Sequence, residues 1–257
     1  MLKNKQEILS YLREQRHWIS IREEKDWLGI FHFGSYNYNL ADDKSDVDCR
    51  YIVFDEEPIR EYINEVGEHI EVVNFNEFIR GVLGGQLTFI ETIATELYFI
   101  NPLYMEDWKI IHSLIENLAA SLAPNIFNNF PEWGKEVVDG FLRNLTEDPL
   151  GQVLGFPPKR ISHMKRAIII TERLVNKQYS NLFILTEEDI VEHKLIKRGI
   201  KFSDKREAKK VIQQDYKILV EKSKHKFDKV PTIPRNFFRA VYNIRTKHNM
   251  QIKQGGQ

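Results

Sequence analysis

The stretch GIFHFGSYNYNLADDKSDVDCRYIVF, residues 29–54, decides the fold of the N-terminal half of the chain. Two apolar runs, 27–33 and 47–54, have the length and composition of buried strands. Gly34-Ser35 ends the first run, and turn-forming polar residues separate it from the second. The stretch therefore predicts two strands joined by a polar turn.

The other segments predict helices around a third short strand, 68–73. We therefore expect an α+β fold, with a small mixed sheet and flanking helices in 1–104. A mainly helical domain, basic from about residue 156, should follow in 105–257, although 105–145 could belong to either part. The first two expected helices are 4–16 and a segment ending at residue 83 that Asn74 or Asn76 could cap. The others are 88–96, 105–120, 131–145, 159–177, 186–198, 204–222 and 234–247.

The composition is that of a folded soluble protein, with 42% hydrophobic and 29% charged residues. Cys49 is the sole cysteine, so no disulfide can form within the chain and a reducing compartment is expected. The N-terminal residues lack the apolar core of a signal peptide, and no run approaches the roughly 18 apolar residues of a membrane helix. We expect a cytoplasmic protein without a membrane partner.

The balanced net charge hides an asymmetry along the chain. Residues 1–150 hold 13 Lys+Arg and 27 Asp+Glu, a balance of −14, and residues 151–257 hold 24 and 10, a balance of +14. Segregated signs can arise from solvated helix faces alone. The size of the split favours a basic half that meets a polyanion such as RNA, beside an acidic half that binds metal ions.

Two carboxylates begin the second predicted strand. Because successive side chains of a strand point to opposite faces, Asp46 and Asp48 share one face with Arg50, while Val47 and Cys49 lie on the other. Carboxylates about 7 Å apart repel each other unless a cation lies between them, and they suit hard cations such as Mg²⁺ or Mn²⁺. The spacing predicts a site for two metal ions, with Arg50 either neutralising the aspartates or binding a phosphate.

Gly34 and Ser35 supply groups that could bind a phosphate. Glycine permits a sharp turn and a close approach of the backbone to a ligand. If residues 35–39 begin a helical turn, its free N–H groups point at the phosphate, and the Ser35 hydroxyl adds a donor. We expect the triphosphate of an NTP to lie between this turn and the metal ions.

A third carboxylate is expected on a neighbouring strand, where it would hold the metal ion on the side of the nucleophile. Glu71 is the best candidate because it is a lone carboxylate in an apolar strand. The alternative, favoured equally, is that Glu71 is an exposed strand residue with no chemical role. Glu68 and Glu77 are the fallback candidates.

These features resemble the nucleotidyltransferase superfamily typified by DNA polymerase β, which uses a Gly-Ser turn, an Asp-x-Asp strand and a third acidic residue. The longer pattern resembles the polymerase-β-like nucleotidyltransferases found with RNA ligases in bacterial and phage RNA repair, which read Gly-Ser-x-x-Tyr-Gly and then Ser-Asp-x-Asp-x-Arg-Gly. The matching positions are Gly34, Ser35, Tyr38, Ser45, Asp46, Asp48 and Arg50. Asn39 and Tyr51 replace two glycines of the pattern, and Asn39 can preserve the turn because Asn tolerates left-handed backbone angles.

The resemblance implies an α+β nucleotidyltransferase core, two Mg²⁺ ions, an NTP substrate and an RNA ligase as a partner, in a bacterial or phage-infected cell. It implies nucleotide-binding roles for Gly34, Ser35, Tyr38, Ser45 and Arg50. The segment 159–166 resembles the helical His-x-x-Arg part of the family, so that His163 and Arg166, on one helix face, would contact a nucleotide or an RNA strand. A structural histidine and a surface arginine are the alternative.

Several other residues predict structure rather than chemistry. His32, in an apolar strand, is expected in the core, as are three aromatic residues at helical spacing: Phe237, Phe238 and Tyr242. The basic runs 194–210 and 217–229 lack the interleaved aromatic residues of a stacking platform, so they predict contacts with an RNA backbone and no reading of bases. No His/Cys cluster has the spacing of a zinc site.

The sequence thus predicts a Mg²⁺-dependent nucleotidyltransferase, with Asp46, Asp48 and Glu71 as metal ligands and an RNA 3′ end as the acceptor. Two alternatives remain open. The acceptor could be a protein side chain or a small molecule, or the chain could be a catalytically silent module that binds nucleotides or RNA.

Overall fold

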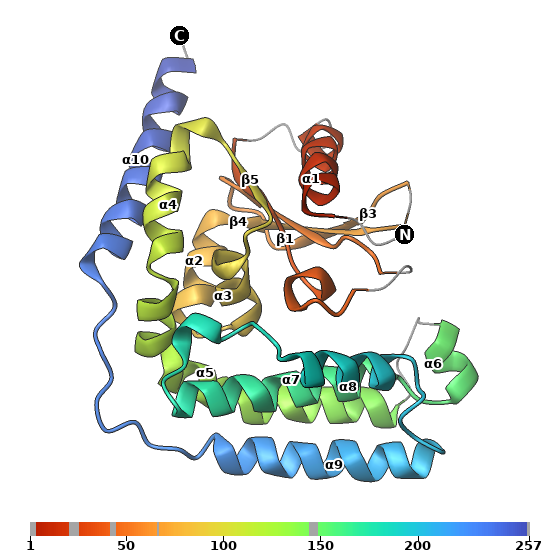
Figure 1. Ribbon diagram of the computed structural model, residues 1–257. Helices are drawn as coiled ribbons and strands as arrows, with labels where there is room; N and C mark the ends of the chain where they lie inside the picture. The colour runs from red at the N-terminus through yellow and green to blue at the C-terminus, as the bar shows by residue number, and fades with distance from the viewer. Residues whose placement is uncertain (1–3, 21–25, 42–44, 66, 144–148, 256–257) are drawn as a thin grey trace. The chain divides into compact units, whose positions relative to one another are not determined.

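The computed structural model describes residues 4–20, 26–41, 45–65, 67–143 and 149–255 (Figure 1). The contacts between its residues divide the chain into two compact units. We call them the sheet unit, Met1–Ser121 with Pro231–Gln257, and the helical unit, Leu122–Val230.

A mixed sheet with the strand order β3-β4-β2-β1-β5 forms the centre of the sheet unit. Strands β2 and β4 run parallel, and the other neighbouring strands are antiparallel. The strands are β1 (Trp27–His32), β2 (Cys49–Val53), β3 (Arg60–Ile63), β4 (His69–Asn74) and β5 (Tyr98–Ile100). The α+β class and three predicted strands are confirmed, as β1, β2 and β4. The two outer strands, β3 and β5, are short and were not predicted.

Helix α1 (Lys5–Ser20) covers one face of the sheet, and Figure 1 shows it on the side opposite to α2 and α3. Its apolar residues Ile8 and Leu12 pack with the side chains of β2 that alternate toward this face. Those side chains, together with the residue before the strand, are Val47, Cys49, Tyr51 and Val53. The predicted alternation of the second strand is therefore confirmed.

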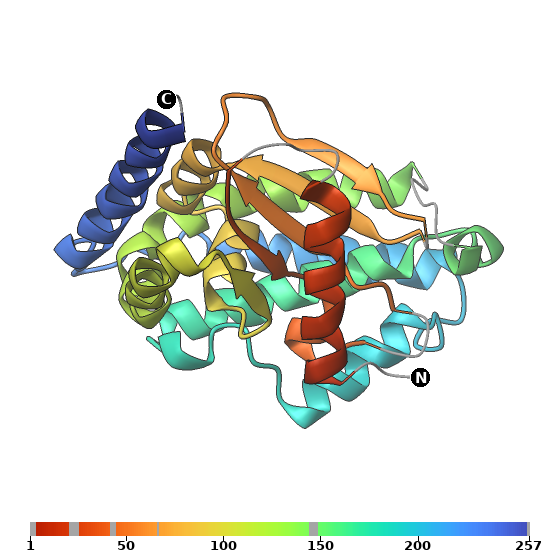
Figure 2. The same cartoon turned by 90° about the horizontal axis from the view of Figure 1, so that it is seen from above.

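In the view from above, α1 lies in front of the sheet (Figure 2). An aromatic cluster fills the opposite face, next to α2 (Phe75–Leu83), α3 (Leu87–Ala94) and α4 (Met105–Ser113). The rings of Phe31 and Trp108 lie 4.6 Å apart, and Phe78 packs edge-on against Phe89 at 5.8 Å. Asn74, one of the two caps that the sequence offered, caps α2 by accepting a hydrogen bond from the backbone N–H of Glu77. Burial of these rings gives α3 a fixed place beneath β1 and β2.

The last helix, α10 (Arg235–Gly255), packs along α4 in the sheet unit. Asp107 of α4, which is 4% exposed, accepts hydrogen bonds from Lys247 Nζ at 2.6 Å and Asn243 Nδ2 at 2.9 Å. Tyr104 OH donates to Gln251 Oε1 at 3.1 Å. The division into units therefore differs from the predicted boundary at 104/105. Helices α4 and α10 pack against each other and both belong to the sheet unit.

This division changes where the charge lies. The sheet unit holds 16 Lys+Arg and 22 Asp+Glu, a balance of −6, and the helical unit holds 21 and 15, a balance of +6. The split between the units is weaker than the split between the two halves of the sequence, because the basic helix α10 belongs to the acidic unit and the acidic segment 122–150 belongs to the helical unit.

The helical unit is built on α5 (Ile115–Leu142), which begins in the sheet unit and continues through Pro124 and Pro131. The sequence predicted two separate helices here. Tyr216 OH donates to Pro131 O at 3.3 Å, and a Cβ at Gly134 would lie 2.9 Å from the same tyrosine ring, so the glycine permits close packing. The other helices are α6 (Pro149–Leu154), α7 (Pro158–Val175), α8 (Glu187–Lys197) and α9 (Lys205–Lys222).

Polar contacts join α7 to its neighbours α8 and α9. Ser162 and His193, both buried, lie 2.8 Å apart, and burial lowers the pKa of His193 to about 4. Lys165 lies 3.4 Å from the buried Asp215 of α9.

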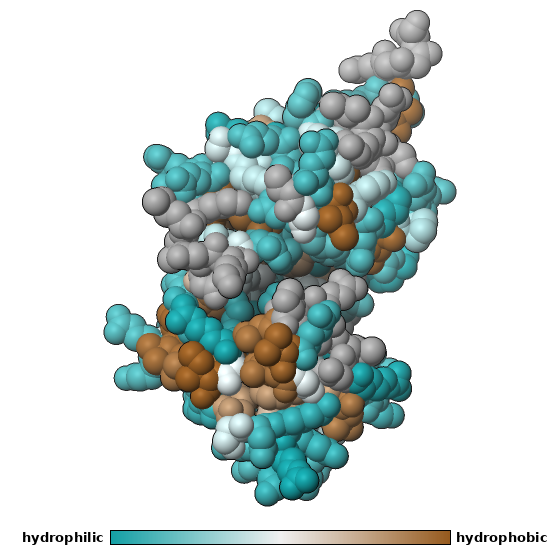
Figure 3. All heavy atoms as spheres, turned by 90° about the vertical axis from the view of Figure 1, so that its right-hand side faces the viewer, coloured by the Kyte–Doolittle hydropathy of each residue, from teal (hydrophilic) through white to brown (hydrophobic). Residues whose placement is uncertain are grey.

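Figure 3 shows apolar surface among hydrophilic residues on this unit, where Val153 is 85% exposed. Within the described residues, none of the helices combines the length and apolarity that crossing a membrane requires.

Two adjacent phenylalanines test the position of α10. Phe237 is fully buried, whereas Phe238 is 48% exposed, because neighbouring residues point about 100° apart on a helix. We expect Phe237→Ala to lower the free energy of unfolding by about 3–5 kcal/mol and Phe238→Ala by less than about 0.5 kcal/mol. Chemical denaturation of the full chain measures both. Equal losses would contradict the assignment of the inner face of α10.

Candidate active site

The Gly-Ser turn follows β1 directly. Gly34 has a φ of +95°, and residues Ser35–Tyr38 form a 3₁₀-helix that ends at Asn39 with a φ of +55°. The helical turn considered at 35–39 is therefore present, and Asn39 adopts the left-handed conformation that asparagine tolerates. Ser35 is half-buried at the first position of this turn.

Gly34 brings the turn against Asp48. A Cβ atom at Gly34 would lie 3.3 Å from Asp48 Oδ2, and the backbone N–H of Phe33 donates to Asp48 O at 3.2 Å. Asp48 is half-buried and Asp46 is exposed, and both precede β2. The structure thus brings together the Gly-Ser turn and the second aspartate, which the sequence predicted as parts of one site.

A buried carboxylate that the sequence analysis missed holds the turn in place. Glu91 of α3 is 5% exposed, and its Oε1 accepts hydrogen bonds from the Gly34 N–H at 3.1 Å and from Asn37 Nδ2 at 3.2 Å. Asn37 Oδ1 in turn accepts from Thr95 Oγ1 at 2.9 Å. A lone carboxylate in the apolar helix LTFIETIA was the signal that could have revealed Glu91.

His32 completes this polar network beneath the turn. The His32 side chain is fully buried, and its Nδ1 lies 3.1 Å from Asn37 Oδ1. Burial lowers the pKa of His32 to about 4, so the ring is neutral at neutral pH and Nδ1–H donates to the amide oxygen. The prediction that His32 lies in the core is confirmed.

Arg50 has a structural role that differs from both of its predicted roles. Its guanidinium is 3% exposed and donates to Glu71 Oε2 from Nε at 2.9 Å and from Nη2 at 2.6 Å. Nη1 donates to Thr88 O and Thr92 Oγ1 of α3, and the rings of Phe33 and Phe89 lie 5.0 and 4.5 Å from the guanidinium carbon. Arg50 therefore neutralises Glu71 and binds β2, β4 and α3 together.

The same contacts decide the position of Glu71. It lies on β4 beside β2, as predicted, and is paired in register with Arg50. Within the described residues, no three His, Cys, Asp or Glu side chains gather in a way that could hold a metal ion. Asp46 and Asp48 offer the carboxylate oxygens that Mg²⁺ and Mn²⁺ prefer, and their role as metal ligands stays a prediction. Glu71, bound to Arg50, does not fit as a third ligand in this arrangement.

The fallback carboxylates also have other partners. Glu68 is buried and accepts a hydrogen bond from the Val47 N–H at 3.4 Å, and Glu77 pairs with Arg80 at 2.7 Å. Tyr38 is 2% exposed, so its ring lies in the core instead of facing a nucleotide. Ser45 is half-buried, and its predicted contact with the nucleotide stays a prediction.

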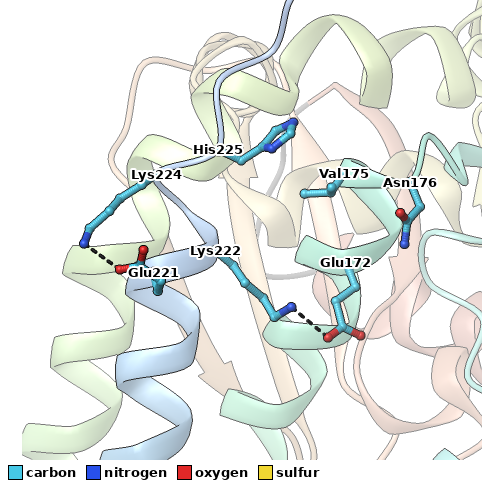
Figure 4. Close-up of a pocket in the computed structure, with 7 residues that line it drawn as sticks. All are labelled: Glu172, Val175, Asn176, Glu221, Lys222, Lys224 and His225. Atoms are coloured by element: carbon cyan, nitrogen blue, oxygen red, sulfur yellow. Dashed lines mark hydrogen bonds and ion pairs between the residues drawn. The ribbon is translucent and has the colours of Figure 1, made fainter.

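His163 and Arg166 belong to α7 of the helical unit, where His163 is exposed and Arg166 half-buried. Their predicted contact with a nucleotide or RNA stays a prediction. The helical unit also has a cavity of about 620 Å³, and its lining includes two ion pairs, Lys222 with Glu172 at 3.0 Å and Lys224 with Glu221 at 2.6 Å (Figure 4). None of the predicted site residues lines it.

The sequence matches no protein-family model and no curated protein. The chain is similar to a solved crystal structure described as a nucleotidyltransferase-like protein from Exiguobacterium sibiricum 255-15. The two chains are 12% identical, with 90% of this chain and 86% of the other covered and a TM-score of 0.29. A TM-score this low does not establish a shared fold, so the chemistry of the site rests on the residues described above.

Gly34→Ala tests the contact between the turn and Asp48. The added Cβ would crowd Asp48 Oδ2 in a backbone conformation that strains any residue but glycine. We expect at least about a tenfold loss of binding for a magnesium–NTP complex, equivalent to ~1.4 kcal/mol. Gly67→Ala is the matched control, because Gly67 has a φ of +86° and nothing lies within 4 Å of its added Cβ. Unchanged binding in Gly34→Ala would contradict the arrangement.

Glu71→Gln separates the structural role of Glu71 from the metal-binding role. Loss of the carboxylate leaves the buried Arg50 without its counter-charge, so we expect the free energy of unfolding to fall by about 3 kcal/mol. Glu77→Gln, which breaks an exposed Glu–Arg pair, should cost less than about 1 kcal/mol. Unchanged stability in Glu71→Gln, with a raised Mg²⁺ requirement for transfer, would contradict the buried pairing and favour the metal ligand.

Proposed function

We propose that the protein is a Mg²⁺-dependent nucleotidyltransferase that transfers a nucleoside monophosphate from an NTP to a hydroxyl group. One observation carries the proposal: the Gly-Ser turn is held beside the Asp-x-Asp pair, with a Cβ at Gly34 placed 3.3 Å from Asp48 Oδ2. A turn that approaches a ligand with its backbone and a pair of hard oxygen donors are the two parts that a metal-bound triphosphate requires.

The reaction exchanges one phosphorus–oxygen bond for another. The acceptor oxygen forms a bond to the α-phosphorus, the bond from that phosphorus to the oxygen bridging to the β-phosphate breaks, and pyrophosphate leaves. The hydroxyl proton passes to water. Mg²⁺, when bound, would favour loss of this proton and balance the charge of the departing pyrophosphate.

The residues of the chain would orient the reactants. Asp46, which is exposed, and Asp48, which is half-buried beside the turn, would hold the metal ions. The Ser35 hydroxyl would donate to a phosphate oxygen from the first position of the turn. Glu91 supports this role indirectly, because it holds the Gly34 N–H and Asn37 and so fixes the shape of the turn.

We propose an RNA 3′ end as the acceptor hydroxyl. The supporting observations are the resemblance of residues 34–50 to the RNA-repair nucleotidyltransferases and the positive balance of the helical unit. The lysines and arginines of 194–210 and 217–229 would contact phosphates of the RNA backbone, and the release of counterions from the RNA would favour this binding. An RNA ligase partner follows from the resemblance alone.

Asp46→Asn with Asp48→Asn tests the reaction. Because amide oxygens bind Mg²⁺ more weakly than carboxylates, we expect transfer of labelled nucleotide to RNA to fall by at least about a hundredfold, with the free energy of unfolding nearly unchanged. Asp228→Asn, a change at an exposed aspartate of the helical unit, is the control and should transfer at the wild-type rate. A double variant that matched the wild-type rate would exclude this site.

A silent module that binds a nucleotide without transferring it is the second candidate. It is favoured by the commitment of Glu71 to Arg50, which leaves the aspartate pair without the third carboxylate of the superfamily. Calorimetry with Mg²⁺-NTP and a panel of RNA, protein and small-molecule acceptors discriminates the two. Nucleotide binding with no transfer to any acceptor would favour the silent module.

A further inference from the structure

The outer face of α10 combines arginine with exposed aromatic rings. Phe238 is 48% exposed and Tyr242 is 68% exposed, so the prediction that both lie in the core is wrong. Phe237, by contrast, is buried as predicted. We call the outer face the α10 stripe, which consists of Arg235, Phe238, Arg239, Tyr242 and Arg245.

Helical geometry places the five side chains of the α10 stripe on one surface. At 100° per residue, all of them lie within about 60° of the direction of Tyr242, and the stripe is about 15 Å long. The opposite direction is taken by buried Phe237, Ala240 and Ile244. The exposed rings of Phe238 and Tyr242 therefore do not form the face of α10 that packs in the core, because Phe237, Ala240 and Ile244 form that face.

The charge on α10 is of one sign. The helix contains five lysine and arginine residues and no aspartate or glutamate. Within the described residues, Lys247 alone among these cations pairs with a carboxylate, Asp107. Arg245 donates to the neutral Asn76 of α2 at 2.8 Å, which orients its guanidinium without cancelling the charge. A helix with this charge on an otherwise acidic unit has a surface suited to a polyanion.

We infer that the α10 stripe binds a single-stranded nucleic acid, with bases stacked on Phe238 and Tyr242 and phosphates held by the arginines. Aromatic rings accept the face of any base, and arginine both neutralises phosphate and stacks. The bound strand would be the acceptor for nucleotide transfer, a role that rests on the proposed function. The binding itself requires neither an NTP nor a metal ion.

Other occupants fit the α10 stripe less well. Two copies of the chain joined symmetrically through this face would bring like charges together. The lysine-rich runs of the helical unit can attract a phosphate backbone, but they offer no interleaved aromatic rings. The α10 stripe offers exposed rings and positive charge together on one helix face.

Fluorescence anisotropy of labelled 15-mers of oligo(U) and oligo(dT), measured with the full chain and without NTP, tests the inference. We expect Phe238→Leu with Tyr242→Leu to weaken binding about tenfold or more, because leucine keeps the apolar area but loses the ring. The matched control is Met250→Ala with Ile252→Ala on the same helix, at residues 52% and 58% exposed, which should bind like the wild type.

Salt dependence separates charge from stacking. Arg235→Gln with Arg239→Gln should lower the slope of log Kd against log salt concentration by about 1.4, or 0.7 for each phosphate contact of a single strand. The leucine variant should keep the wild-type slope. Asp46→Asn with Asp48→Asn should bind the oligonucleotides normally, so that failure of catalysis and failure of strand binding are told apart.

Four results would overturn the inference. The leucine variant could bind as tightly as the wild type, or the Met250 and Ile252 control could lose as much affinity. Binding could instead be lost only when Lys209 and Lys210 of the helical unit are changed to glutamine. Finally, Tyr242→Ala could change the oligomeric state in light scattering without affecting oligonucleotide binding, which would identify a protein interface.

Discussion

The geometry of the candidate site depends on one buried carboxylate. Glu91 Oε1 accepts the Gly34 N–H and Asn37 Nδ2, and so binds the Gly-Ser turn to α3. Hydrogen bonds to a charged acceptor are stronger than neutral ones, and a carboxylate buried at 5% exposure requires such partners. This hydrogen bond holds Gly34 at its positive φ, the conformation in which the turn lies against Asp48.

Helix α3 is itself fixed to the sheet by a second polar centre. Arg50 reaches Thr88 and Thr92 on α3, while Glu71 on β4 balances its charge. Thr88 and Thr92 lie near Glu91 along the same short helix, so one helix links the turn, β2 and β4. A buried ion pair contributes little net stability but costs several kcal/mol when one partner is lost, about 3–5 in measured cases. The pair is therefore best understood as fixing the register between α3 and the two strands.

The sequence predicted the elements whose signal is local. Apolar runs and periodicity identified β1, β2, β4 and most helices, and Asn74 marked the start of α2. The outer strands β3 and β5, of four and three residues, are too short for a periodic signal and depend on pairing with β4 and β1. The continuous helix α5 was missed because proline normally interrupts a helix, whereas here tertiary packing outweighs that preference.

Long-range partners explain the remaining differences at the site. The Gly-Ser turn, the alternation of the strand that follows it and the conformation of Asn39 could be read from the sequence, because each depends on neighbouring residues. The pairing of Arg50 with Glu71 and the role of Glu91 depend on contacts across 21 and 57 positions of sequence. The place of α10, and with it the exposure of Phe238 and Tyr242, depends on its packing against α4.

The most direct test of this account is calorimetric titration of a magnesium complex of a non-hydrolysable NTP into the wild type, Glu91→Leu and Glu91→Gln. Glutamine retains an oxygen acceptor for the Gly34 N–H, whereas leucine leaves that group without a partner. We expect the wild type to bind the nucleotide, Glu91→Gln to weaken binding by less than about threefold, and Glu91→Leu to weaken it by about tenfold or more. Circular dichroism checks that each variant is folded. Equal affinity of Glu91→Leu and the wild type, or no binding of the nucleotide by the wild type, would contradict the account.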